Sequence, residues 1–160
     1  MAEGQTKGIN MAVSEKSRTT EESEIRRLID TFTRALNAKD VDRIMAVYAP
    51  DVRVFDLPPP LQNKGAQTHR RNFAAWFATW RSPIGAEIRE LSITTGEDVA
   101  FCHFLNRISG TKTDGDEAAY WVRVTLGLRK TDGRWAVVHE HVSVPFYMDG
   151  SMRAALDLTP

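Results

Sequence analysis

Hydrophobic residues recur at helical spacing in the first quarter of the chain. Thr19 and Glu22 have the spacing of a capping box, in which each side chain satisfies a free backbone donor at a helix start. The apolar residues that follow keep to one helical face as far as Asn37. They are Ile25, Leu28, Ile29, Phe32, Ala35 and Leu36. This pattern predicts an amphipathic helix with one buried side.

A second, shorter helix is predicted directly after the first. Asp40 is a suitable N-cap, and Pro50 cannot continue a helix. Between them, four residues again recur at helical spacing: Val41, Ile44, Met45 and Tyr48. Beyond the proline, Val52, Val54 and Asp56 share one face of a predicted short strand. That face is therefore apolar until it ends on a carboxylate.

A proline loop separates this strand from a third predicted helix. Three prolines within residues 57–61 fix φ and remove three backbone donors, so this segment suits neither a helix nor a strand interior. Beyond Gly65 a helix is predicted that ends near Pro83. It carries an aromatic stripe: Phe73, Trp76, Phe77 and Trp80. Such a stripe indicates core packing, and the lining of a pocket is a special case of it.

The second half of the chain has the pattern of long strands. Turn signals stand at Gly96, between Gly110 and Gly115, and at Gly133. The strands predicted between them cover residues 86–95, 99–110, 118–130 and 134–146. Together with the helices, this order predicts an α+β domain in which an antiparallel sheet carries its helices on one face.

Composition and length fit one globular domain. Hydrophobic residues make up 42% and charged residues 26% of the 160 residues, enough for a sizeable core. Residues 1–18 are polar and lack periodicity. We therefore predict a flexible N-terminal arm over residues 1–18, a single domain over residues 19–147 and a tail over residues 148–160.

Charge and cysteine content narrow the functional classes. Lys plus Arg and Asp plus Glu both total 21, so no excess positive charge is available to neutralise nucleic-acid phosphates. The single Cys102 fits a reducing compartment and lies in an apolar strand, where it is expected to pack as a small hydrophobic residue. The chain has neither an apolar signal segment nor a run long enough to span a bilayer. We expect a cytoplasmic protein that binds neither nucleic acid nor membranes.

Two separated motifs resemble one protein superfamily. The sequence FTRALNAKD at 32–40, with YAPD at 48–51 and VFD at 54–56, resembles the opening of SnoaL-like and ketosteroid-isomerase-like proteins of the nuclear transport factor two-like superfamily. DGRW and VHEHVSVP, within residues 132–145, resemble its last strand, including that of the association domain of calmodulin-dependent kinases. The resemblance spans residues 20–146 and implies a cystatin-like fold, with three helices on the concave side of a cone-shaped, strongly curved, mixed sheet that is mainly antiparallel. Because this fold supports many enzymes and non-catalytic modules, function depends on the site residues.

The resemblance assigns a general base to Asp56. In ketosteroid isomerase an Asp removes a proton beside a carbonyl, while a Tyr and a protonated Asp stabilise the resulting enolate. The Tyr position falls here on Phe32 and the acid position near Val124, so both donors are missing and steroid isomerisation is disfavoured. From the residues alone, Asp56 is either a base whose pKa is raised in a pocket or an exposed carboxylate that caps the strand-to-loop turn.

The last predicted strand carries a second candidate carboxylate. Regular alternation places Trp135, Val137, His139, His141 and Ser143 on one face and Ala136, Val138, Glu140, Val142 and Val144 on the other. The second face is more uniformly apolar, and the resemblance places it on the concave side. We therefore expect Glu140 inside the pocket, where a carboxylate must be paired or protonated. His103 and Arg107 are candidate partners, depending on which face of their strand looks inward.

The opposite face of the sheet is a candidate homodimer contact. On the neighbouring strand the apolar row is expected to face inward, so Trp121 and Arg123 point outward together with His139 and His141. We expect these four residues to contact a partner subunit. Two histidines two residues apart could also bind zinc, but no third ligand has suitable spacing, and no metal site is expected.

Two functional hypotheses follow. In the first, a cofactor-independent isomerase, cyclase or dehydratase uses Asp56 to abstract a proton from a small, largely apolar carbonyl compound, assisted by Tyr48 or Glu140. The residues expected to bind that substrate are Phe32, Phe73, Trp76, Trp80, Val124 and Val142. In the second, the domain is not catalytic and serves ligand binding or dimerisation. The missing oxyanion donors favour the second hypothesis, and Asp56 favours the first.

Overall fold

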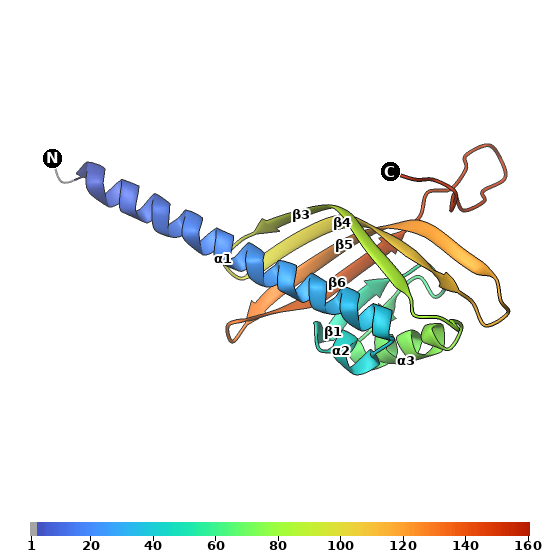
Figure 1. The fold of residues 1–160 in the computed structure, drawn as a ribbon. Coiled ribbons are helices and arrows are strands. Elements are labelled where there is room, and N and C mark those ends of the chain that lie inside the picture. Colours follow the sequence, from blue (N-terminus) through green and yellow to red (C-terminus); the bar gives the residue numbers. More distant parts are fainter. Residues whose placement is uncertain (1–2) are drawn as a thin grey trace.

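Helix α1 (Glu3–Ala38) is the first element of the fold (Figure 1). The computed structural model describes residues 3–160, with side chains from residue 19 onward. The flexible arm predicted for residues 1–18 therefore lies outside the described side chains. Thr19 stands within the helix, so the prediction that the helix begins there was wrong. A capping-box sequence marks a helix start only where the preceding backbone leaves the helical conformation.

The described part of α1 packs one apolar face onto the sheet. Ile25, Ile29 and Leu36 are buried there, as their helical spacing predicts. At the edge of this contact, the Glu21 carboxylate accepts hydrogen bonds from Lys130 Nζ and from the indole nitrogen of Trp135, at 2.7 and 2.6 Å. None of the helices in the part of the chain that the structure describes combines the length and the hydrophobicity needed to cross a lipid bilayer.

Six strands form one open, mixed sheet. Their bounds are β1 (Tyr48–Phe55), β2 (Asn63–Lys64), β3 (Gly85–Thr95), β4 (Val99–Thr111), β5 (Glu117–Thr131) and β6 (Arg134–Ser143). They lie in the order β2-β1-β6-β5-β4-β3, and all neighbours are antiparallel except β1 and β6. The three helices lie on one side of this curved sheet (Figure 1). The predicted fold class is therefore confirmed.

Strands β4 and β5 each present one buried row to the helices. The row on β4 is Ala100, Cys102, Phe104, Asn106 and Ile108, and the row on β5 is Val122, Val124, Leu126 and Leu128. His103 and Arg107 consequently point to the opposite face, so the expectation that one of them partners a pocket carboxylate was wrong. Burial raises the pKa of the Cys102 thiol to about 12, which suits a core side chain and not a nucleophile.

Strand β6 does not alternate regularly along its length. Its register with β5 shifts at Val138, which forms a β-bulge. Trp135 and Val137 are buried before the bulge, and Glu140 is buried after it. The expectation that Trp135 and Val137 face away from the concave side was therefore wrong, because a bulge moves the alternation by one residue. Glu140 lies on the concave side as expected.

Helix α2 (Val41–Met45) is shorter than predicted. Asp40 caps it as expected, since its carboxylate accepts a hydrogen bond from the backbone nitrogen of Arg43 at 3.0 Å. The helix ends before Tyr48, which instead begins β1 and pairs with Val137 of β6. The helical spacing of Tyr48 was misleading because pairing with a strand distant in the sequence outweighs local periodicity.

Helix α3 (Ala66–Phe77) follows the proline loop and ends earlier than predicted. Trp80 lies in the turn beyond its end, is only 2% exposed, and forms an isolated bridge with Lys112. The Lys112 ammonium stands 3.6 Å above the Trp80 ring centroid, a cation–π contact. Trp80 thus lies beyond the helix, although its ring still packs edge-on against Trp76 of the aromatic stripe, with the centroids 5.7 Å apart.

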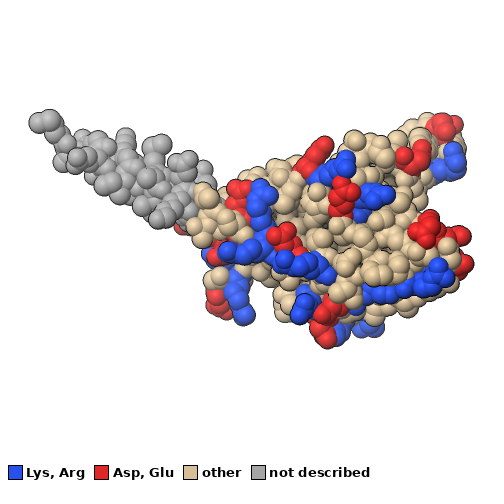
Figure 2. Space-filling model, in the orientation of Figure 1, with Lys and Arg blue, Asp and Glu red and all other residues tan. Residues whose placement is uncertain are grey.

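Charged side chains of both signs are scattered over the face shown in Figure 2, most of which is uncharged, and Lys and Arg are interspersed there with Asp and Glu. Arg26 lies 2.8 Å from Glu22 one helical turn away, and Arg89 lies 2.8 Å from Glu87 on β3. This face therefore has no continuous positive surface of the kind that follows a nucleic-acid backbone.

Candidate functional site

A cavity of about 420 Å³ lies between the helices and the concave face of the sheet. Its volume falls in the range typical of small-molecule sites. Five of the wall residues predicted from the sequence line it: Phe32, Phe73, Trp76, Val124 and Val142. The polar residues in its wall are Asp56, His69, Asn72, Asn106, Tyr120 and Glu140. Trp80 does not line the cavity, because α3 ends before this residue.

Asp56 follows the last residue of β1 and lines the cavity. Its Oδ1 accepts a hydrogen bond from the backbone nitrogen of Leu57 at 2.8 Å, so it also caps the strand-to-loop turn. Burial raises the pKa of the Asp56 carboxyl and the charge of Glu140 adds to this, while the Leu57 nitrogen and His69 act in the opposite direction. Asp56 thus combines features of both interpretations, because it lines a pocket with a raised pKa and also caps the turn.

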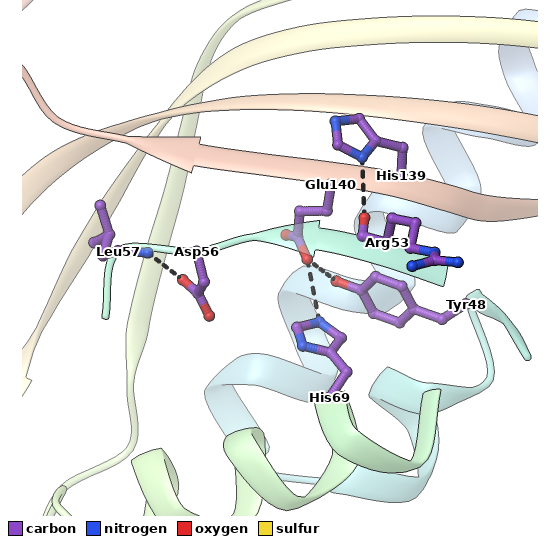
Figure 3. Close-up of polar contacts among 7 residues, drawn as sticks. All are labelled: Tyr48, Arg53, Asp56, Leu57, His69, His139 and Glu140. Atoms are coloured by element: carbon purple, nitrogen blue, oxygen red, sulfur yellow. Dashed lines mark hydrogen bonds and ion pairs between the residues drawn. The ribbon is translucent and has the colours of Figure 1, made fainter. Parts of the chain in front are cut away.

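Glu140 is buried on β6 and has two polar neighbours (Figure 3). The Tyr48 hydroxyl donates a hydrogen bond to Glu140 Oε2 at 2.8 Å, and His69 Nε2 lies 3.1 Å from the same oxygen. Burial, followed by the neighbouring Glu140, raises the pKa of Tyr48 well above its ordinary value. Tyr48 therefore stays protonated and acts as a donor. Glu140 was expected to have partners if it was buried, and these are Tyr48 from β1 and His69 from α3.

His69 is a site residue that the sequence analysis did not select. It comes from α3, is 3% exposed, and its ring lies edge-on to Tyr48 and Phe73, with centroids 4.7 and 4.6 Å apart. Its distance to Glu140 suits an ion pair, although the direction departs from that of a hydrogen bond. His69 stands four residues before Phe73, on the same helical face as the aromatic stripe. That spacing was the signal that could have identified it.

Asn106 is the second site residue that was missed. It is 5% exposed on β4, lines the cavity, and its amide oxygen has no hydrogen-bond partner among the described residues. The sequence signal that could have identified it is its position on one strand face between the apolar residues Phe104 and Ile108. This signal was ambiguous, because the opposite face of β4 also mixes apolar and polar side chains.

The positions that correspond to the oxyanion donors of ketosteroid isomerase are apolar here. Phe32 and Val124 both form parts of the cavity wall. Tyr120 on β5 lines the same cavity, and its pKa is raised by burial and by the charge of Asp56. The cavity wall therefore combines the partly buried carboxylate of Asp56 with the protonated phenol of Tyr120, and with Glu140 and His69, groups suited to proton transfer. Tyr48 does not line this cavity and contacts it only through its hydrogen bond to Glu140.

Comparison with known proteins identifies relatives of this arrangement. The SnoaL-like domain family matches residues 25–147. A solved NTF2-like protein of unknown function from Pseudomonas putida KT2440 is 34% identical, with a TM-score of 0.81, and the match covers 89% of this chain and 98% of that one. No curated protein matches the sequence.

More distant structures share the fold alone. A proposed scytalone dehydratase from Novosphingobium aromaticivorans is 15% identical, with a TM-score of 0.73, over 85% of this chain and 91% of its own. The association domain of CaMKII from C. elegans is 19% identical, with a TM-score of 0.65, over 79% of this chain and 98% of its own. The same architecture thus occurs in proteins named for catalysis and for assembly.

Proposed function

The chain belongs to the SnoaL-like domain family, and we propose that it is a cofactor-independent acid–base enzyme for small, largely apolar carbonyl compounds. In this proposal Asp56 removes a proton from the carbon beside the carbonyl group, the first step of an isomerase, cyclase or dehydratase. One observation carries the proposal: a partly buried carboxylate with a raised pKa lines an apolar cavity of small-molecule size.

The environment of Asp56 suits a base. A carboxylate that is poorly hydrated binds a proton more strongly, which brings its pKa closer to the pH at which an enzyme works. The charge of Glu140 also raises the pKa of Asp56, although no hydrogen bond joins the two carboxyl groups (Figure 3). Glu140 is therefore assigned a positioning and tuning role, and Tyr48 supports it by holding its carboxylate.

Removal of the proton leaves the electron pair of the C–H bond on the substrate, where it becomes negative charge on the carbonyl oxygen. A donor near that oxygen lowers the barrier. Tyr48 already donates to Glu140, so Tyr120 is the phenol assigned to this task. Its raised pKa keeps it protonated, and the influence of Asp56 on that pKa supports a shared space for the two side chains.

The proposal is tested by proton exchange in D₂O, because abstraction beside a carbonyl exchanges that hydrogen for deuterium whatever the natural reaction is. A panel of aryl and cyclic ketones, acetophenone among them, is incubated with the protein and followed by ¹H NMR. Exchange faster than in buffer of the same pH supports the proposal. Background rates with every ketone in the panel would contradict it.

A second candidate function, homodimerisation through the convex face, is favoured by exposed apolar side chains. Phe101 of β4 pairs in register with Gly127 of β5, which pairs with His139 of β6. Two residues farther along β6, His141 pairs with Phe55 of β1. Phe101 is 48% exposed and Phe55 is 40% exposed. The predicted contact residues Trp121, Arg123, His139 and His141 stand on strands of this same face. We infer that a second copy of the chain covers it, as the kinship in fold with an association domain supports.

Replacing Phe101 by Asp should convert a dimer into a monomer, because it places a charge in an interface that must be desolvated. Light scattering after size exclusion should give the wild type twice the 18.0 kDa mass of one chain, and the variant that mass once. Leu61→Asp is the matched control, since Leu61 is 97% exposed in the proline loop. A monomeric wild type, or a Phe101→Asp variant that remains dimeric, would rule out this interface.

A further inference from the structure

Residues 145–157, the C-terminal hairpin, form a loop that the proposed chemistry does not use. The loop projects from the end of β6, away from α2 and α3 (Figure 1). A bridge between Phe146 and Ala154 joins its two arms, and the backbone nitrogen of Ala155 donates a hydrogen bond to the Pro145 carbonyl at 2.8 Å. None of the hairpin residues lines the cavity. The hairpin is therefore a separate feature of the surface.

The C-terminal hairpin is held in shape and yet leaves apolar side chains in solvent. The Tyr147 hydroxyl donates to the Asp157 carboxylate, whose oxygens lie 2.9 and 2.8 Å away, and the Ser151 nitrogen donates to Asp149 Oδ1 at 3.0 Å. Four large apolar side chains are nevertheless exposed, Met148 most of all at 83%. They are Phe146, Met148, Met152 and Leu156. Such a cluster on an ordered segment indicates a protein contact, because little conformational entropy is lost when it binds.

The hairpin also carries two ionised carboxylates. Hydrogen bonds from Ser151 hold the pKa of Asp149 below its ordinary value, and the hydrogen bond from Tyr147 does the same for Asp157. Arg153 is the one cation among residues 145–157, so two carboxylates against one guanidinium leave a net charge of −1. Neither carboxylate forms an ion pair with a side chain that the structure describes. A surface that complements this hairpin is therefore both apolar and positively charged.

A surface of this kind lies on the convex face of the sheet. Strand pairing places Arg107 opposite Trp121, and Arg123 opposite Leu105. The Arg89 guanidinium lies 5.0 Å from the Trp121 ring centroid. These five residues form the arginine patch: Arg89, Leu105, Arg107, Trp121 and Arg123.

Two cations of the arginine patch have no anionic partner. Glu87 stands opposite Arg107 in the strand register, but its carboxylate pairs with Arg89 at 2.8 Å. Arg107 and Arg123 form no ion pair within the part of the chain whose side chains are described. Arg123 is in register with Ser143, the last residue of β6. The patch therefore lies at the end of the sheet from which the C-terminal hairpin departs.

We propose that two copies of this chain each pack their C-terminal hairpin on the arginine patch of the other. Asp149 and Asp157 then lie beside the partner's two unpaired arginines, and the apolar side chains cover the partner's Trp121. The inference rests on the second candidate function, the dimer through the convex face, and specifies what that face binds. A two-fold axis parallel to the strands brings the same ends of the two sheets together, so both hairpins reach a patch at once. The net charge of −1 on each hairpin complements the two unpaired arginines.

Photo-crosslinking tests where the hairpin lies. The residue p-benzoylphenylalanine replaces Met148, and ¹⁵N-labelled chains are mixed with unlabelled chains, so that mass spectrometry recognises a crosslink between two copies. The crosslinked peptide should come from the other copy and contain Arg107, Trp121 or Arg123. Crosslinks that stay within one chain, or that reach another part of the other copy, would overturn the inference.

Removal of the two carboxylate charges tests the electrostatic part of the contact. The double variant Asp149→Asn with Asp157→Asn keeps oxygen acceptors for Ser151 and Tyr147, so the hairpin retains its hydrogen bonds. The dissociation constant of the dimer, measured by analytical ultracentrifugation, should rise about tenfold, the effect of losing two exposed ion pairs. Asp132→Asn is the matched control, because Asp132 is exposed in the turn before β6 and its φ of 50° suits Asn. Equal dissociation constants for the wild type and the double variant would contradict the contact.

These results separate the hairpin contact from the dimer itself. A monomeric wild type removes both proposals. If Phe101→Asp is monomeric while the photo-crosslinker at position 148 reacts only within its own chain, the convex-face dimer stands and the hairpin contact is rejected. If the crosslink reaches the arginine patch while Phe101→Asp remains dimeric, the hairpin contact stands and Phe101 lies outside the interface.

Discussion

Replacing Asp56 by Asn should lower the catalysed exchange of ketone α protons by about 10²–10⁴-fold, the usual contribution of a positioned general base. Asn has nearly the same shape and can still accept the hydrogen bond from the Leu57 nitrogen, but it cannot take up a proton at neutral pH. The rate measured by ¹H NMR in D₂O should fall close to that of buffer. Exchange that survives at the wild-type rate would assign the base to another residue.

The same substitution should not weaken the fold, and this distinguishes loss of chemistry from loss of structure. The pKa of Asp56 is raised in the folded state, so folding loses stability as the pH rises through that pKa and the carboxyl ionises. Asn removes this pH-dependent loss. Urea unfolding at pH 7 should therefore show Asp56→Asn to be at least as stable as the wild type, with the difference disappearing at a pH well below 4.

Replacing Glu140 by Ala should destabilise the protein by about 3 kcal/mol, the upper end of the range for a buried donor that is left without its acceptor. The Tyr48 hydroxyl would lose its acceptor at 2.8 Å, and the buried His69 would lose the carboxylate at 3.1 Å. The free energy of unfolding from urea titrations measures this effect. A loss below about 1 kcal/mol would show that the cluster contributes little to stability.

Two milder variants separate the contributions within this cluster. Glu140→Gln keeps an acceptor for the Tyr48 hydroxyl and should cost less than Glu140→Ala. Tyr48→Phe keeps the ring that packs against Phe32 and Phe73 and loses only the hydroxyl, at a cost of about 1–3 kcal/mol for the acceptor left unpaired. If the hydrogen bond links the two residues, the effects of Glu140→Ala and Tyr48→Phe will not add in the double variant, because each substitution alone already removes the bond.

The fold was predictable where the pattern is local. The four long strands and the buried face of α1 follow from alternation and helical spacing, and the structure places them within a few residues of the predicted ranges. The pattern failed where a distant segment decides the conformation. Tyr48 repeats at helical spacing but pairs with β6, and the bulge at Val138 reverses the faces of β6 on either side of it.

The site was predictable only in part, for a related reason. Glu140 was selected because a carboxylate among apolar residues is a visible anomaly in a sequence, whereas Asp56 was selected mainly through the resemblance to ketosteroid-isomerase-like proteins. His69 and Asn106 stand in patterns that mix polar and apolar residues, so their burial depends on which face of α3 and which face of β4 look inward. The direction in which each face points is decided by tertiary packing, which cannot be deduced from the periodicity of the sequence.

We propose that the cavity shields the carboxylate of Asp56 from bulk water and so makes it a stronger base. Titration of the Asp56 carboxyl carbon by ¹³C NMR, with Asp56→Asn used to assign the resonance, measures this directly. Burial of the carboxyl predicts a midpoint above the ordinary aspartate value of about 4. A midpoint at or below about 4 would contradict it.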